Sequence, residues 1–246
     1  MFLFDTRKNK NDVYVISAGC FVIAMILMFT VIANLVTESM YLQAASATAE
    51  GIVVIDAGHG GEDSGAIAKN GVYEKDLNLK IANTLGKYLE NAGFAVVYTR
   101  TEDKLLYTEE ENIKGIRKIS DLKNRLKISE SYVGATLVSI HMNSFSEEKY
   151  SGLQVYYSTN NENSRPLAES IQNSVKAKLQ PNNNRNIKNG ENIYLMKNST
   201  NAAVLIECGF LTNTEECAKL CEKEYQKELC FAIVCGIIDA KEKTNP

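Results

Sequence analysis

The sequence predicts an α/β protein with a mostly parallel or mixed sheet and helices on both faces, preceded by one N-terminal transmembrane helix. Short apolar, β-branched runs alternate with longer segments of helical periodicity from residue 51 onward. The strand segments are almost continuously apolar, which is typical of strands covered by helices on both sides. A long charge-free stretch near the N-terminus predicts the membrane helix.

The charge-free stretch covers residues 13–36. A helix of this length would reach about 36 Å, enough to cross a hydrocarbon core of roughly 30 Å. Cations precede the stretch and Glu38 follows it, so the positive-inside rule places residues 1–12 in the cytosol and the rest of the chain outside. These cations are Arg7, Lys8 and Lys10.

A cleaved signal peptide is the alternative to an anchor, because small-x-small sequences at 45–47 and 47–49 resemble cleavage sites. The apolar stretch exceeds the roughly 7 to 15 residues typical of signal peptides, which favours an uncleaved anchor. Residues 37–50 are small and polar, and we interpret them as a short tether. A single extracytoplasmic domain is expected at 51–246.

This domain is expected to begin with a strand, a loop and a helix. Residues 51–56 are apolar and β-branched, which predicts the strand. Residues 74–91 place leucine and isoleucine at helical spacing, and Gly93 is a typical helix stop. The next strand is expected at 94–99.

The remaining residues continue the alternation. The further strands are expected at 135–140, 153–157, 193–196 and 203–206, and the helices at 120–133, 165–179 and, as one or two helices, 214–240. The asparagine-rich residues 182–192 are expected to form an exposed loop that could line a groove. In such sheets, functional groups gather at the carboxyl ends of the strands.

Charge and cysteine content exclude several classes of protein. The formal net charge is −3 and no long basic run occurs, so nucleic acid is not expected as a partner. The sequence has six cysteines but no C-x-x-C motif, which argues against zinc ribbons and thioredoxin-type redox centres.

The two histidines of the chain, His59 and His141, each follow a predicted strand. Glu74 begins the first predicted helix of the domain, and Glu207 ends the 203–206 strand. Two imidazoles and one carboxylate form the typical ligand set of a catalytic zinc, whose fourth position is open to water. Glu207 would then be the carboxylate that transfers the proton.

Simpler interpretations remain open on spacing alone. His59 could be a hydrogen-bonded loop residue, and the glycines around it could form only a tight turn. Glu74 could serve only to stabilise the N-terminus of its helix.

Six motifs nevertheless resemble, in order, those of the zinc-dependent N-acetylmuramoyl-L-alanine amidases, the Amidase_3 family. They span most of the domain: Asp56-Ala-Gly-His-Gly-Gly-Glu-Asp-Ser-Gly-Ala66, Glu74-Lys-Asp-Leu-Asn-Leu79, Tyr98-Thr-Arg100, Arg125, Ser139-Ile-His-Met-Asn143 and Ala203-Val-Leu-Ile-Glu-Cys-Gly-Phe-Leu-Thr-Asn213. The resemblance implies that His59, Glu74 and His141 bind zinc and that Glu207 is catalytic.

The resemblance also implies the reaction, which is hydrolysis of the amide between the lactyl group of N-acetylmuramic acid and L-alanine in peptidoglycan. An anchored single domain is most similar to a sporulation-specific member that prepares muramic lactam in spore cortex, between the mother-cell and forespore membranes. A vegetative wall-remodelling or cell-separation amidase and a non-catalytic peptidoglycan-binding module are the alternatives. An accessory activator protein is a further potential partner.

Three other residues are candidates for substrate binding: Asn143, Arg100 and Arg125. An arginine can hold a substrate carboxylate through paired hydrogen bonds. Salt bridges at the protein surface are the alternative role for the two arginines.

Overall fold

The computed structural model describes residues 20–32 and 50–244. The chain divides into two compact units, Met1–Thr48 and Ala49–Pro246. In the first unit, residues 20–32 are helical. No helix within the described residues is both long enough and apolar enough to cross a membrane. The ends of the predicted anchor, residues 13–19 and 33–36, lie outside the described residues, so the anchor stays a prediction.

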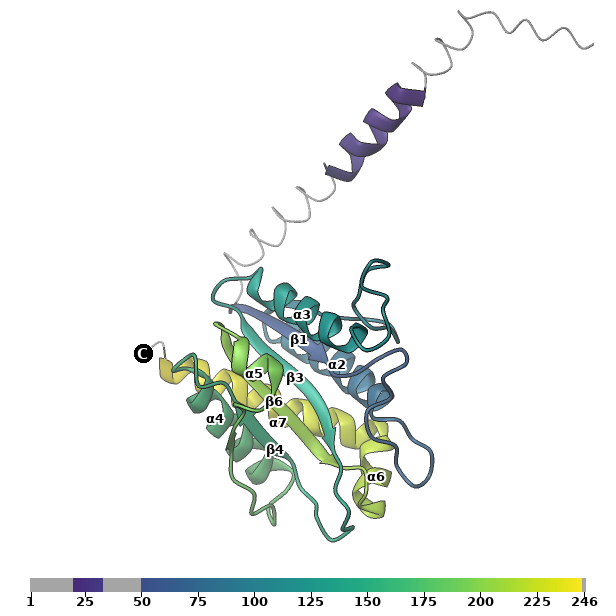
Figure 1. Ribbon diagram of the computed structural model, residues 1–246. Helices are drawn as coiled ribbons and strands as arrows, with labels where there is room; N and C mark the ends of the chain where they lie inside the picture. Colours follow the sequence, from purple (N-terminus) through teal and green to yellow (C-terminus); the bar gives the residue numbers. More distant parts are fainter. Residues whose placement is uncertain (1–19, 33–49, 245–246) are drawn as a thin grey trace, which may run out of the picture. The chain divides into compact units, whose positions relative to one another are not determined.

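The second unit contains one six-stranded sheet, in the order β2-β1-β3-β6-β4-β5 (Figure 1). β1, β2, β3 and β6 are parallel, whereas β4 is antiparallel to β6 and parallel to β5. The sheet is therefore mixed, as predicted. Its strands are β1 (Ile52–Ala57), β2 (Ala95–Tyr98), β3 (Thr136–Asn143), β4 (Gln154–Tyr157), β5 (Lys188–Asn189) and β6 (Ala202–Phe210).

Helices cover both faces of the sheet (Figure 1). α2, α4, α6 and α7 pack on one face and enclose the larger apolar core, while α3 and α5 pack on the other. This arrangement confirms the predicted α/β class. The helices are α2 (Glu74–Asn91), α3 (Arg117–Glu130), α4 (Ser164–Lys178), α5 (Tyr194–Asn198), α6 (Thr214–Cys221) and α7 (Lys223–Thr244).

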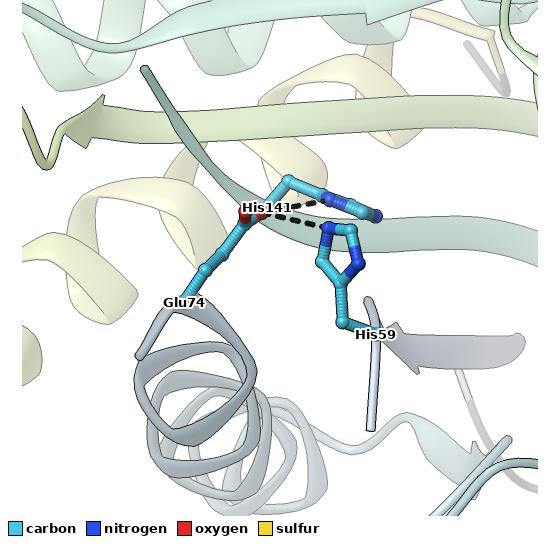
Figure 2. A group of neighbouring side chains, drawn as sticks. All are labelled: His59, Glu74 and His141. Atoms are coloured by element: carbon cyan, nitrogen blue, oxygen red, sulfur yellow. Dashed lines mark hydrogen bonds and ion pairs between the residues drawn. The ribbon is translucent and has the colours of Figure 1, made fainter. Parts of the chain in front are cut away.

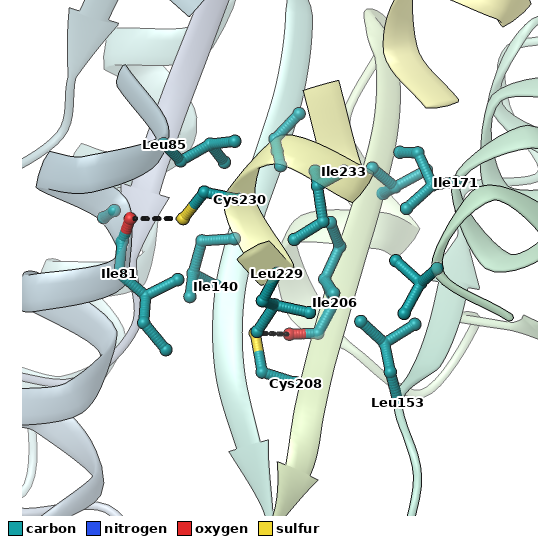
Figure 3. Close-up of a cluster of buried hydrophobic side chains, with 14 of the residues drawn as sticks. Ile81, Leu85, Ile140, Leu153, Ile171, Ile206, Cys208, Leu229, Cys230 and Ile233 are labelled. Atoms are coloured by element: carbon teal, nitrogen blue, oxygen red, sulfur yellow. Dashed lines mark hydrogen bonds between the residues drawn. The ribbon is translucent and has the colours of Figure 1, made fainter. Parts of the chain in front are cut away.

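The larger core lies on one face of β6, so the neighbouring residues Glu207 and Cys208 have different surroundings. Cys208 packs between Ile206 and Leu229, and Cys230 packs against α2 beside Ile81 (Figure 3). Both thiols are buried and free, so they act as small apolar side chains. Because strand side chains alternate, Glu207 projects from the opposite face of the sheet.

One predicted element is wrong and two strands are longer than predicted. Residues 193–196 are expected as a strand, but residues 194–196 belong to helix α5 and Ile193 precedes it, because a short apolar run fits a buried helix as well as a strand. β3 continues to Asn143 and β6 to Phe210, so His141 and Glu207 lie within their strands. The loop expected at 182–192 contains the two-residue strand β5.

Candidate metal centre

Three side chains from separate elements meet at the carboxyl end of the sheet (Figure 2). His59 lies in the loop after β1, Glu74 is the first residue of α2, and His141 lies in β3. The ligand atoms of all three lie within 4.8 Å of one another. The structure thus brings together the predicted ligand set.

The spacing of these atoms fits a zinc ion. Oε1 of Glu74 is 3.2 Å from Nε2 of His59 and 3.0 Å from Nδ1 of His141. Two ligands on a tetrahedral zinc are about 3.3 Å apart when the bonds are about 2.0–2.1 Å long. Imidazole nitrogens and a carboxylate are also the donors that catalytic zinc prefers.

His59 is held in place by its own loop. Its backbone has a φ of 61°, a left-handed conformation that is uncommon for residues other than glycine. Oδ2 of Asp63 lies 2.9 Å from Nδ1, which leaves Nε2 facing Glu74. Burial lowers the pKa of His59, but Asp63 and Glu74 outweigh it and raise that pKa to about 9. Such carboxylate–histidine pairs orient metal ligands.

Two glycines allow the chain to approach these ligands closely. A Cβ atom on Gly58 would lie 2.1 Å from Nε2 of His141. A Cβ atom on Gly65, whose φ is +63°, would lie 2.5 Å from Oε2 of Glu74. Any side chain at either position would therefore displace one of the candidate ligands, which gives these glycines a role beyond a tight turn.

Glu74 is fixed as a carboxylate at the start of α2. Its Oε1 accepts a hydrogen bond from the backbone N–H of Met142 at 3.0 Å, and Oε2 accepts one from Ala66 at 2.8 Å. Burial raises the pKa of Glu74, but the two imidazoles outweigh it and hold that pKa far below its usual value. A group this readily ionised is suited to binding a cation.

Glu207 lies beside the cluster on the neighbouring strand. Its Cα pairs with that of His141 in the β3–β6 register, so the two side chains share a face. Its Oε2 is shielded from solvent and has no hydrogen-bond partner among the described residues. Burial is the main cause that raises the pKa of Glu207 to about 7. This carboxylate is placed to exchange a proton near the cluster.

The two candidate arginines, Arg100 and Arg125, lie beneath the loop that carries His59 and are fully buried. Arg125 pairs with Asp56 and Asp121 and donates to the backbone carbonyl of His59 at 2.7 Å. Arg100 donates to the carbonyls of Ala57 and Gly58, among others. Surface salt bridges are therefore wrong for both arginines, because both are buried. These contacts support the loop, and substrate binding by either arginine stays a prediction.

Several supporting residues were not predicted from the sequence. Asp63 orients His59, and Asp56 accepts hydrogen bonds from Thr99 and Ser139 as well as its ion pair with Arg125. The one sequence signal for the contact between Asp63 and His59 was the position of Asp63, four residues after His59 in a glycine-rich turn. Asn143, the third substrate candidate, lies half-buried at the end of β3.

Comparison with known families identifies the family of the chain. A model of the N-acetylmuramoyl-L-alanine amidase family matches residues 53–239, a range that includes His59, Glu74, His141 and Glu207. The chain belongs to this family. The resemblance that its motifs predict is confirmed, and membership supports hydrolase activity on peptidoglycan.

Individual members of the family are similar over most of the chain. A germination-specific N-acetylmuramoyl-L-alanine amidase of Bacillus subtilis (strain 168) is 35% identical over 187 residues, covering 76% of this chain and 78% of that protein. The structure of the CwlD amidase from Clostridioides difficile, in complex with the GerS lipoprotein, is 39% identical with a TM-score of 0.75. The similarity covers 78% of this chain and 98% of that one.

A third similar protein comes from a different genus. The structure of the amidase AmiC2 of Nostoc punctiforme is 32% identical, with a TM-score of 0.66. The similarity covers 78% of this chain and 97% of the AmiC2 chain. Each of the three similarities covers at least 76% of this chain.

Proposed function

We propose that this chain is a zinc-dependent amidase that hydrolyses the bond between the lactyl group of N-acetylmuramic acid and L-alanine. The observation that carries the proposal is the cluster of His59, Glu74 and His141 beside the buried carboxylate of Glu207. A non-catalytic binding module would have no need of this complete set of groups.

Each side chain then has a defined role in the reaction. Zinc, when bound, supplies a Lewis acid that polarises the scissile carbonyl and activates a water molecule. Asp63 keeps the His59 ring oriented toward the site. Glu207 accepts a proton from the attacking water and passes it to the nitrogen of L-alanine, which leaves as an amine. A carboxylate whose pKa is about 7 is suited to both transfers near neutral pH.

The cellular role that we propose is formation of muramic lactam in spore cortex. Similarity to the germination-specific amidase and to CwlD supports this role. The complex of CwlD with GerS supports an accessory lipoprotein as a partner for this chain too. We propose that residues 13–36 anchor the protein in the membrane with its catalytic domain outside the cytoplasm.

Digestion of isolated peptidoglycan by the purified full-length protein tests the chemistry. Mass spectrometry is expected to detect free stem peptides that begin with L-alanine, and a chelator should abolish their release until zinc is restored. His59→Ala, Glu74→Ala and His141→Ala should each lose zinc, because two protein ligands remain where catalytic sites use three. Full zinc occupancy in any one of the three variants would show that the ligand set is wrong.

Deletion of the gene in the native organism tests the cellular role. Growth and division should be unchanged, while muramic lactam should disappear from the cortex. Chained vegetative cells with a normal cortex would instead support the cell-separation alternative.

A further inference from the structure

A pocket of about 290 Å³ lies beyond the metal centre, at the carboxyl ends of β3 and β6. Two positively charged side chains and several aromatic rings line it, together with the side chain of Asn143 at the end of β3. These residues include Asn143, Tyr150, Tyr156, Arg185, Lys188 and Phe210. No acidic side chain is among the described residues that line this pocket.

The pocket continues from the catalytic groups along the same strands. Asn143 follows His141 by two residues in β3, which is about 7 Å along a strand. Phe210 follows Glu207 by three residues in β6. A substrate whose scissile amide lies at the metal centre can therefore extend directly into the pocket.

Arg185 is held in the wall of this pocket by two contacts. Its Nη2 donates a hydrogen bond to Oε1 of Gln154 at 2.9 Å, and its guanidinium carbon lies 4.7 Å from the ring centroid of Phe210. Gln154 is buried and is itself fixed, because its Nε2 donates to the carbonyl of Asn186 at 2.7 Å. Its Cα also pairs with that of Glu207 across the β4–β6 register.

The charge of Arg185 has no carboxylate partner among the residues that the structure describes. The Nε atom of Arg185 is shielded from solvent and has no hydrogen-bond acceptor among the described residues. A shielded guanidinium donor normally finds an acceptor, since leaving it unpaired is costly. Arg185 therefore has donor capacity that an anionic ligand would satisfy.

We infer that this pocket binds a free carboxylate of the stem peptide, and that Arg185 selects for it. The inference rests on the proposed amidase function. In peptidoglycan, the residue after L-alanine is a D-glutamate linked through its γ-carboxyl group, which leaves the α-carboxyl group free or amidated. An extended peptide advances about 3.3–3.6 Å per residue, so this group lies about 7 Å beyond the scissile amide, level with Asn143. The planar guanidinium matches a carboxylate through charge-assisted hydrogen bonds.

The test compares two uncross-linked glycan strands that differ only at the second stem residue, D-isoglutamate in one and its amide D-isoglutamine in the other. The full-length wild-type protein should cleave the acid with a kcat/KM about 10- to 100-fold higher than the amide, as expected for a hydrogen bond to a charged group. Arg185→Gln should remove most of this preference while retaining zinc. Arg165→Gln, which removes an exposed charge on α4, is the matched control and should keep the preference.

The ratio between the two substrates separates selection from structural damage. If Arg185→Gln lowers both rates equally, or if the wild-type protein cleaves both strands equally, the inference is wrong while the amidase function stands. If the wild-type protein with bound zinc cleaves neither strand, the proposed function fails and the inference fails with it.

Discussion

Substitution of Gly58 by alanine should remove metal binding without unfolding the protein. The new Cβ would lie 2.1 Å from Nε2 of His141, whereas an ordinary van der Waals contact is about 3.4 Å or longer. The imidazole must therefore move by about 1.3 Å, more than half the length of a zinc–nitrogen bond of about 2.0–2.1 Å. A shift of this size leaves His59 and Glu74 as the aligned ligands.

We expect Gly58→Ala to weaken zinc binding at least 100-fold, because losing a group that only orients a metal ligand already costs about 10- to 100-fold, and here the ligand itself is displaced. Zinc affinity would be measured by competition with a chromophoric chelator, and folding by circular dichroism. Gly71→Ala is the matched control, because a Cβ atom there has nothing within 4 Å. Its φ of +84° should lower stability but leave zinc affinity unchanged.

A Gly58→Ala protein that binds zinc with wild-type affinity would refute this reasoning. It would mean either that the loop moves away from His141 at little cost or that the His141 ring is not a ligand. Equal loss of zinc in Gly71→Ala would instead attribute the effect to general destabilisation of the loop.

Three further predictions concern charge and topology. Burial opposes ionisation of Asp56, but Arg125 and two hydroxyl groups outweigh it and lower the pKa of Asp56 to about 2. The ionised carboxylate should therefore stabilise the fold by about 2 kcal/mol above pH 4. This stabilisation should be lost as the pH falls toward 2. Between pH 4 and pH 2 the wild type should lose about 2 kcal/mol more stability than Asp56→Asn, because Glu74 keeps its own acid dependence in both proteins; an equal loss on denaturation would contradict the prediction. Because the pKa of metal-free His59 is about 9, zinc uptake at pH 7 should release a proton, measurable by calorimetry in buffers of different ionisation enthalpy; heats independent of the buffer would contradict it. N-terminal sequencing of the membrane-bound protein should find an uncleaved chain, whereas a start near Thr48 or Glu50 would indicate a signal peptide.

The meeting of the three candidate ligands at one edge of the sheet was predictable because the sequence signals for their positions are local. Both histidines of the chain follow apolar strand segments, and helix α2 has the bounds that its periodicity predicts, with Glu74 as its first residue. In a parallel sheet, such positions converge at one edge. The candidate cluster therefore followed from the order of the elements.

The supporting contacts were not predictable because they depend on packing between distant segments. Arginine is usually exposed, and nothing local to Arg125 shows that it is buried with Asp56 beneath the loop. Arg185 contacts Gln154 from a loop that the sequence predicts only as polar and exposed. The short run at 193–196 fits a strand or a helix equally well until its neighbours are known.

The most direct test of the central claim is the activity and zinc content of Glu207→Gln. This change keeps the size of the side chain but removes the basic carboxylate beside the candidate metal ligands. We expect this variant to bind about one zinc per chain and to fold like the wild type, while its rate of stem-peptide release falls about 10²- to 10⁴-fold, or roughly 3 to 5 kcal/mol of barrier. Near-full turnover would show that another residue transfers the proton, and loss of zinc would place Glu207 among the ligands.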